Sequence, residues 1–302
     1  MVETYCTPLK TFFAPGSVVD HTTGLQIMQG LPDNEYYNAA WGSGRKLGIN
    51  SLQAEPQHYI VITDKNNLVC KIWEKEFSGK LMILRRGQLD TQNVLMFKLS
   101  KEAVSNVWWP LKATKKGSGK LTTALLVFMN STLGIVHMLG ERLETRGLWL
   151  EFKKGQLTEL PLPDFRKINK KIMLQLFREN HLNEAISAPL PNIREYMAMM
   201  SGLEAEKGNY ESAINEALKD QKTKHRAVLD KISIQMLKML GCHTIPNRLY
   251  ELVFEEIESL RRIMEAANRS SGTVRDRGSD VIKKSMINIR GSSKNISQNS
   301  RR

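Results

Sequence analysis

The sequence contains few cysteines and no hydrophobic run long enough to cross a membrane. Its three cysteines, Cys6, Cys70 and Cys242, are odd in number and far apart. They do not form a disulfide framework pattern, so we expect a reduced protein of the cytoplasm. The longest apolar run, near Ala124–Met129, is far shorter than the roughly 20 residues of a membrane-spanning helix. The first residues, MVETYCTPLKTFF, lack a secretory signal pattern, and we expect no membrane partner.

Acidic residues are scarce relative to basic ones. The chain has 44 Lys and Arg against 31 Asp and Glu, which gives a net charge of +13. Such an excess favours an anionic partner, most simply a polyanion such as nucleic acid. The alternative is a charge that aids solubility or belongs to a basic tail. Nine basic and two acidic residues follow Asn268, so this tail carries about half of the excess.

The residue patterns of common enzymes are also missing. KKGSGKLT at 115–122 resembles a phosphate-binding loop, but Thr114 stands where the first glycine belongs and Leu121 replaces the magnesium-binding hydroxyl residue. We interpret it as a basic loop before a helix, whose amides and lysines could still hold a phosphate. Cys242 and His243 have no second Cys/His pair at zinc spacing, and no Gly-x-Ser-x-Gly occurs. His137, in an apolar segment, is more typical of a packed histidine. The sequence therefore predicts no catalytic residue, metal site or cofactor site in this chain.

The patterns that are present predict an α+β fold in three regions. Residues 1–164 are rich in short β-like runs separated by turn residues, namely HYIVIT, NLVCKIW, KLMILRR and NVLMFKL. The first fifty residues look loop-rich. A helix is predicted over Leu121–Leu143, where apolar residues recur at helical spacing, and a strand over Leu148–Phe152. This region is predicted to be a mixed, β-rich domain.

The second and third regions differ in composition and periodicity. Residues 165–268 contain amphipathic segments and are predicted to form a helical domain. Its last helix is expected to begin at Pro246 with Thr244 as cap. Its apolar stripe contains Leu249, Leu252, Val253, Ile257, Leu260, Ile263, Met264 and Ala267, with Glu256 inside it. Residues 269–302 are rich in Ser, Asn and Arg, and are predicted to be a disordered basic tail.

Basic residues are interleaved with aromatic ones in the first region. Such interleaving suits neutralisation of a nucleic-acid backbone together with stacking or groove contacts. The candidate DNA-binding residues are Arg85, Arg86, Lys112, Lys115, Lys116, Lys120, Lys153 and Lys154. Tryptophans in strands are usually buried, and strand alternation predicts that one of Trp108 and Trp109 points inward and the other outward.

Two segments of the first region resemble parts of a known protein family. NVWWPLKA at 106–113 and ALLVFMNSTLGIVHMLGERLETRGLWLEFKKGQLTELPLPD at 124–164 resemble the C-terminal target-recognition region of N6-adenine DNA methyltransferases of restriction–modification systems. That region has a strand ending in Trp-Trp-Pro, a helix with Asn-Ser-Thr-x-Gly, a strand, and FKK-x-x-L-x-x-L-P-x-x-D. The matching residues are Trp108, Trp109, Pro110, Asn130, Ser131, Thr132, Gly134, Arg146, Gly147, Phe152, Lys153, Lys154, Leu157, Leu160, Pro161 and Asp164.

We interpret most of these matching residues as scaffold. Small residues such as Ser131, Thr132 and Gly134 would let the helix approach a sheet closely. Pro161 and Pro163 would stop the strand and lead the chain into the helices.

The resemblance implies a DNA-recognition protein that lacks the catalytic domain of the methyltransferase. The family's catalytic half carries a glycine-rich S-adenosylmethionine loop and an Asn-Pro-Pro-Tyr/Phe motif, and neither occurs here. The chain is therefore expected to bind double-stranded DNA as a specificity module, with residues 1–164 as its recognition domain. Its helical region would dock on a methyltransferase chain, and only that chain would bind S-adenosylmethionine. The alternatives are a helical protein–protein interaction subunit, or a truncated remnant without DNA affinity. An unrecognised nucleic-acid enzyme is a third.

Overall fold

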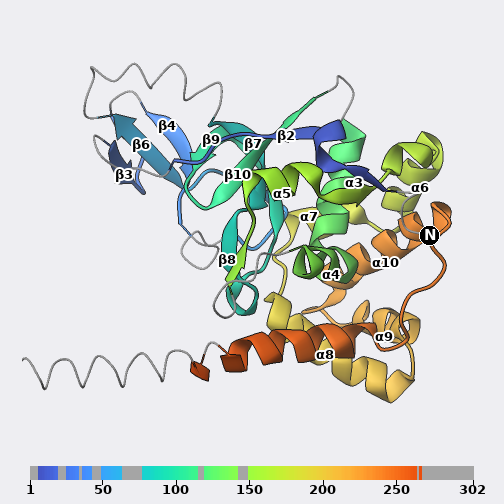
Figure 1. The fold of residues 1–302 in the computed structure, drawn as a ribbon. Helices are drawn as coiled ribbons and strands as arrows, with labels where there is room; N and C mark the ends of the chain where they lie inside the picture. The colour runs from blue at the N-terminus through green and yellow to red at the C-terminus, as the bar shows by residue number, and fades with distance from the viewer. Residues whose placement is uncertain are drawn as a thin grey trace, which may run out of the picture.

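The computed structural model describes residues 6–19, 25–33, 36–42, 49–62, 77–114, 119–141, 149–263 and 265–266. These residues form an α+β fold, which confirms the class expected from the sequence (Figure 1). The predicted tail at 269–302 and the predicted strand NLVCKIW lie outside the described residues.

A mixed sheet occupies one side of the molecule (Figure 1). Its strands are β2 (Phe13–Pro15), β3 (Leu25–Met28), β4 (Tyr37–Ala40), β5 (Gln53–Ala54), β6 (His58–Ile62), β7 (Gly79–Leu84), β9 (Met96–Ser105) and β10 (Trp108–Ala113). The order across the sheet is β2-β10-β7-β9-β4-β6-β3, and β5 also pairs with β9. Strands β4 and β5 run parallel to β9, and the other pairs are antiparallel.

Short strands replace much of the loop expected at the start of the chain. Three of the four predicted hairpin segments form strands, namely β6, β7 and β9. Two further two-stranded sheets lie outside the main one. They pair β1 (Cys6–Pro8) with β12 (Pro161–Pro163) and β8 (Arg86–Gln88) with β11 (Trp149–Glu151). The sheets therefore connect the start of the chain to residues far along it.

The predicted helix at 121–143 is two helices, so this prediction was wrong in detail. Helix α3 (Gly119–Asn130) and helix α4 (Thr132–Gly140) meet at an angle of 78°. Ser131 lies between them, and its hydroxyl accepts from the Gly134 amide at 3.3 Å, which caps α4. Helical periodicity continues through the bend, which is why the sequence did not reveal it. Among the described residues, no single helix is long and apolar enough to cross a membrane. The bent pair of α3 and α4 has the necessary length and apolar composition only when its two helices are counted together.

The proline-rich exit is not the end of a strand, as predicted, but a strand itself. Helix α5 (Lys154–Glu159) follows β11 directly, and the chain then enters β12. Pro8 is paired with Pro161, and Cys6 with Pro163. Proline lacks the amide that a central strand needs, so it is tolerated in this small, two-stranded sheet. Pairing with β1 therefore holds the segment that the sequence predicted to stop a strand and lead into the helices.

Helices fill the other side of the molecule (Figure 1). They are α6 (Lys170–Glu179), α7 (Leu182–Ser187), α8 (Ile193–Lys207), α9 (Tyr210–Ala217) and α10 (Lys224–Met239). Single 3-10 turns are η1 (Leu9–Thr11), η2 (Leu89–Thr91) and η3 (Phe165–Lys167). One hydrophobic cluster runs from β7, β9 and β10 through α3 into α8 and α10, and so continues past Asp164. A small second cluster of Val19, Ala39, Ile60 and Val104 lies at the far end of the sheet.

The last helix begins at 249, three residues later than the sequence predicted. Its first turn is capped by a carboxylate from α8 and not by Thr244. Glu204, only 3% exposed, accepts from the amides of Leu249 and Tyr250 at 3.0 Å and of Glu251 at 3.1 Å. A buried carboxylate at a helix N-terminus satisfies donors that would otherwise lack partners.

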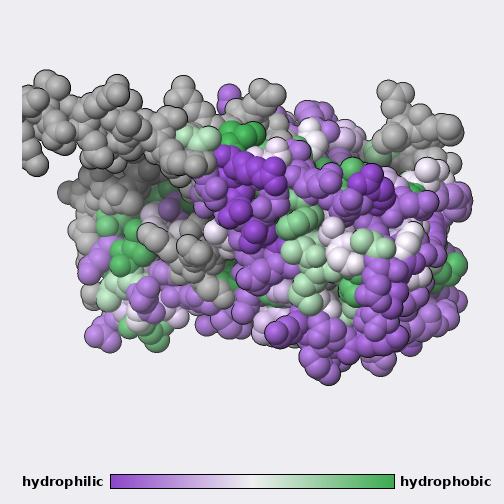
Figure 2. Space-filling model, turned by 90° about the horizontal axis from the view of Figure 1, so that it is seen from below, coloured by the Kyte–Doolittle hydropathy of each residue, from purple (hydrophilic) through white to green (hydrophobic). Residues whose placement is uncertain are grey.

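The apolar stripe of this last helix is only partly buried. Leu249, Val253, Ile257 and Leu260 are buried, and Glu256 lies at a half-buried position. Leu252 and Ile263 are about half exposed, at 49% and 53%, although the sequence placed them in the stripe. The molecule seen from below is mostly hydrophilic with separate hydrophobic areas (Figure 2).

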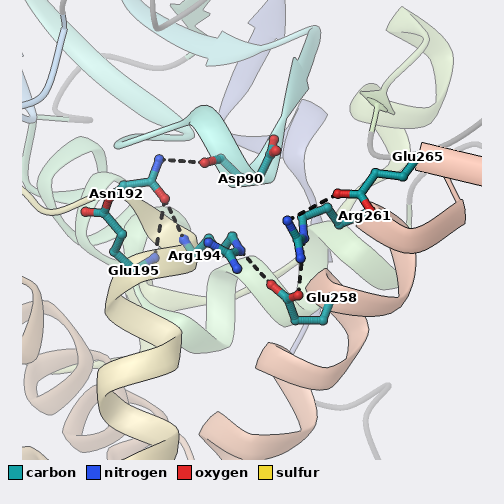
Figure 3. A network of polar contacts seen from close by, with 7 residues as sticks. All are labelled: Asp90, Asn192, Arg194, Glu195, Glu258, Arg261 and Glu265. Atoms are coloured by element: carbon teal, nitrogen blue, oxygen red, sulfur yellow. Dashed lines mark hydrogen bonds and ion pairs between the residues drawn. The ribbon is translucent and has the colours of Figure 1, made fainter. Parts of the chain in front are cut away.

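Polar contacts attach the last helix to the rest of the protein (Figure 3). Arg194 of α8 donates to Glu258 at 2.5 Å, and Arg261 contacts the same carboxylate at 3.2 Å. Asn192 caps α8 by accepting from the Arg194 amide at 2.9 Å, and donates to the Asp90 carbonyl at 2.8 Å. The hydrogen bond with Arg194 keeps the pKa of Glu258 below its usual value. The network therefore joins η2, α8 and the last helix.

Candidate nucleic-acid interface

Arg85 and Arg86 lie where β7 turns into β8. The Arg85 guanidinium donates to the Asn106 carbonyl at 3.0 Å and lies 5.5 Å from the centre of the Trp109 ring. Arg86 pairs with Glu151 at 4.0 Å across the β8–β11 ladder. Arg86 is exposed, whereas Arg85 is half-buried. Arg85 therefore supports the local structure, and Arg86 is the more accessible cation.

Lys153 and Lys154 are brought next to these arginines by tertiary structure. The Phe152 amide donates to the Arg85 carbonyl at 2.9 Å, so the chain enters α5 beside the end of β7. Lys153 is the N-cap residue of α5, and its amide donates to Gln156 at 3.1 Å. Both lysines are exposed, and neither has a carboxylate partner among the described residues. We define Arg85, Arg86, Lys153 and Lys154 as the β8–α5 cluster.

The other four candidates do not all join this cluster. Lys112 is on β10, opposite Ala14 of β2, and is half-buried. Lys120 is in the first turn of α3, and its pKa is lowered by desolvation and by the neighbouring Lys170, the first residue of α6. Lys115 and Lys116 lie outside the described residues. Of the predicted cations that the structure describes, four therefore form the β8–α5 cluster, whereas Lys112 lies on β10 and Lys120 on α3.

Both tryptophans of the motif are buried, so neither is the outward, ligand-accessible ring that strand alternation allowed for. Trp108 is 0% exposed and packs edge-on against Phe97 at 4.8 Å. Trp109 is 9% exposed, and its indole N–H donates to the Phe152 carbonyl at 3.0 Å. Strand alternation still holds, but the chain between β11 and α5 covers the outer face of β10. Neither ring is therefore open to a nucleic-acid base.

Asn130 joins the end of α3 to the start of β9. Its side-chain oxygen accepts from the Leu95 amide at 2.8 Å and the Met96 amide at 3.3 Å. Its amide nitrogen donates to the carbonyls of Met96 at 2.7 Å and Leu126 at 2.8 Å. All four contacts are buried, so this residue satisfies backbone groups that would otherwise be unpaired.

Gly134 allows α4 to approach the end of α3. A Cβ atom at this position would lie 2.0 Å from the Phe128 carbonyl oxygen and 2.7 Å from the Met129 Cα atom. The close approach is therefore between the two helices of the bend, and not between a helix and a sheet as expected. Among the other matching residues, Pro110, Phe152 and Pro161 lie in or beside strands, and Arg146 and Gly147 lie outside the described residues.

Thr132 leads into a buried polar network that the sequence did not reveal. Asp230 of α10 accepts from the Thr132 amide at 2.6 Å and hydroxyl at 2.8 Å, and from the hydroxyls of Tyr196 and Tyr250 at 2.8 Å each. Burial raises the pKa of Asp230, while these hydrogen bonds lower it. The signal in the sequence is Arg226 and Asp230, charged residues four apart on a buried face of α10.

Arg226 extends this network to the backbone of three segments. Its guanidinium donates to the carbonyls of Asn130 at 2.9 Å and Pro191 at 3.2 Å, and also to that of Asn93. Burial lowers its pKa to about 10, which still leaves it charged at neutral pH. Since the side chains of Arg226 and Asp230 are buried, at 0% and 2% exposed, the network stabilises the packing of α10 and does not offer these charges to a substrate.

His137 is half-buried and packs near Phe128, at 6.2 Å between ring centres. Burial lowers its pKa. Within the ranges that the structure describes, no three His, Cys, Asp or Glu side chains are grouped so as to hold a metal ion. The exposed cations Arg86, Lys153 and Lys154 can neutralise and hydrogen-bond phosphate oxygens.

No protein-family model, no curated protein and no solved structure matches this chain.

Proposed function

We propose that this chain is a DNA-binding target-recognition module of the restriction–modification type, serving an N6-adenine methyltransferase whose catalytic residues are on another chain. The observation that carries the proposal is the β8–α5 cluster. Two pairs of cations that are far apart in the sequence meet through the β8–β11 ladder and the hydrogen bond between Phe152 and Arg85. The net charge of +13 and the resemblance of 107–164 to the recognition regions support the same function.

In this proposal the cluster holds the backbone of double-stranded DNA, and loops supply base contacts. S-adenosylmethionine is bound by the partner chain alone, and the complex works in the cytoplasm. The isolated chain is then no enzyme.

The experiment is a salt titration of duplex binding by fluorescence anisotropy. Replacing the three exposed cations in R86Q/K153Q/K154Q should weaken binding and lower the slope of log K against log salt by about 0.9 per lost phosphate contact. Arg85 is left in place because it supports the Trp109 region. The variant K207Q/K219Q/K222Q, which removes as much charge from exposed positions near α8 and α9, is the matched control.

The proposal is wrong if the wild-type chain shows no duplex affinity at low salt. Equal weakening by both variants would show that only net charge matters, and that the β8–α5 cluster is not the contact.

A second candidate function, a protein-interaction subunit, is favoured by the last helix. Leu252 and Ile263, eleven residues apart, lie on one helix face and are about half exposed. Co-purification with a methyltransferase chain that L252E/I263E abolishes, without any duplex affinity, would favour this function instead.

A further inference from the structure

The two-stranded sheet of β8 and β11, here called the β8–β11 ribbon, carries polar residues beyond those of the β8–α5 cluster. Figure 1 shows β8 extending below the strands of the main sheet. The register pairs Arg86 with Glu151 and Gln88 with Trp149. Side chains alternate along a strand, so Arg86 and Gln88 point to one face of the ribbon and Gly87 points to the other. Glu151, directly opposite Arg86, shares the face of Arg86.

The inner face of the ribbon is closed by the protein core. Gly87 is buried, and a Cβ atom there would lie 2.8 Å from the Gln92 Nε2 atom and 2.9 Å from a Leu84 methyl carbon. Gln92 and Leu84 are both 0% exposed. This close packing fixes the orientation of β8, so the face that carries Arg86 and Gln88 is the one turned away from the core.

The outer face presents groups of the kinds that recognise bases in the major groove. The side chains of Arg86 and Glu151 are 53% and 35% exposed, and Gln88 is half-buried. The major groove of DNA is about 12 Å wide and admits a two-stranded β-ribbon. A glutamine side chain can pair with N6 and N7 of adenine, and a glutamate can accept from the N4 amino group of cytosine.

Cations beside the ribbon would allow Glu151 to approach an anionic duplex. Arg86 lies 4.0 Å from Glu151, and a guanidinium has five N–H donors, so it can hold this carboxylate and a phosphate oxygen together. Lys153 and Lys154 follow the end of β11 and are exposed. Phosphate contacts are thus available beside the ribbon and base contacts on its outer face, which is the division of roles found where a ribbon enters DNA.

We infer that the outer face of the β8–β11 ribbon enters the major groove, where Gln88 reads an adenine and Glu151 reads a cytosine. The inference rests on the proposed function, and it adds the ribbon to the loops as a source of base contacts. Gln88 and Glu151 are two positions apart along the ladder, which is about 7 Å. Bases follow one another about every 3.4 Å along a strand of DNA, so the two bases should lie about two steps apart in the recognised sequence.

The test selects binding sites for the full chain from a duplex library with a randomised central stretch, and sequencing gives the base preference at each position. Q88A should reduce the adenine preference, and E151Q the cytosine preference, by roughly 5- to 100-fold at their positions. Because E151Q removes a negative charge, it should also bind unrelated duplexes more tightly.

Two control variants separate base reading from charge. E159Q removes the same charge from the exposed last residue of α5 and should leave every base preference unchanged. K153Q/K154Q should weaken binding to all sequences alike, as expected of phosphate contacts. Circular dichroism checks that each variant keeps the wild-type fold.

The outcomes separate this inference from the proposed function. Loss of the two preferences at positions about two steps apart, with none lost in E159Q, supports both. A selected motif that Q88A and E151Q both keep overturns the inference, while the proposed function stands. Duplex binding without any selected motif overturns the inference and leaves only nonspecific DNA binding from the proposed function. Absence of duplex binding at low salt overturns both.

Discussion

At the scale of single residues, the motif Asn-Ser-Thr-x-Gly is explained by a sharp bend between two helices. Asn130 ties the end of α3 to β9, Ser131 caps α4, and Thr132 binds the buried Asp230. Gly134 faces the Phe128 carbonyl so closely that a side chain has no room. Each residue thus satisfies one geometric requirement of the bend.

The substitution Gly134→Ala should destabilise the protein by about 3 kcal/mol, because its methyl group would overlap backbone atoms that cannot move independently. Urea unfolding measures the change. Gly202→Ala is the matched control: it lies within α8, nothing lies within 4 Å of a Cβ there, and the change should stabilise by about 0.5–1 kcal/mol. Equal effects of the two substitutions would contradict the packing assigned to Gly134.

The substitution Asp230→Asn keeps the shape of the side chain but removes a carboxylate that interacts electrostatically with Arg226, and it replaces an acceptor by a donor. We expect a loss of about 2 kcal/mol in the free energy of unfolding, since hydrogen bonds to a charged group are worth about 1.5–3 kcal/mol each and the tyrosine hydroxyls can reorient. Tyr250→Phe, which removes one of the four donors, should cost less. A smaller effect for Asp230→Asn than for Tyr250→Phe would contradict the central place of the carboxylate.

At the scale of elements, the last helix is held by its end and by one ion-pair network. Glu204 caps its N-terminus, and Glu258 links it to Arg194 of α8 (Figure 3). Its apolar contacts come from a stripe in which Leu252 and Ile263 remain about half exposed. Attachment of this helix therefore depends on polar contacts as well as on burial.

Because the pKa of Glu258 is lowered in the folded protein, its contribution should depend on pH in one direction. The stabilisation is present above the unfolded pKa of a glutamate, about 4.3, and is lost as the pH falls through the lower, folded pKa. The difference in stability between wild type and Glu258→Gln should be about 1–2 kcal/mol at neutral pH and should disappear in acid. Hydrogen exchange of the last helix measures it, with Glu255→Gln, exposed on the same helix, as control. A difference that grows in acid would contradict this assignment.

At the scale of the whole molecule, the two regions separated by the sequence at Asp164 share buried surface. The hydrophobic cluster continues from the sheet into α8 and α10, and Arg226 joins the β8–β9 connection to α3 and to the segment before α8. Removal of either region would expose the apolar face of the other. The domain boundary at Asp164 therefore remains a prediction, based on a change in sequence pattern.

We expect the described regions to unfold in one transition. All five tryptophans precede Asp164, whereas most helices follow it, so fluorescence reports on the first region and far-ultraviolet circular dichroism on the second. Urea curves from the two probes should coincide, as they do when unfolding is cooperative. Two separated midpoints would instead support independent domains.

The sequence alone determined the α+β class, the amphipathic helices α8 to α10, the strands β6, β7, β9 and β11, and the excess of positive charge. These features depend on periodicity and composition, which act over a few neighbouring residues. Only the tertiary structure decided that both Trp108 and Trp109 are buried, that α3 and α4 bend apart, and that the last helix starts at 249. It also decided which cations lie together, because the β8–β11 ladder and the hydrogen bond between Phe152 and Arg85 bring Lys153 and Lys154 beside Arg85 and Arg86. Such contacts between distant residues leave no periodic pattern in a single sequence.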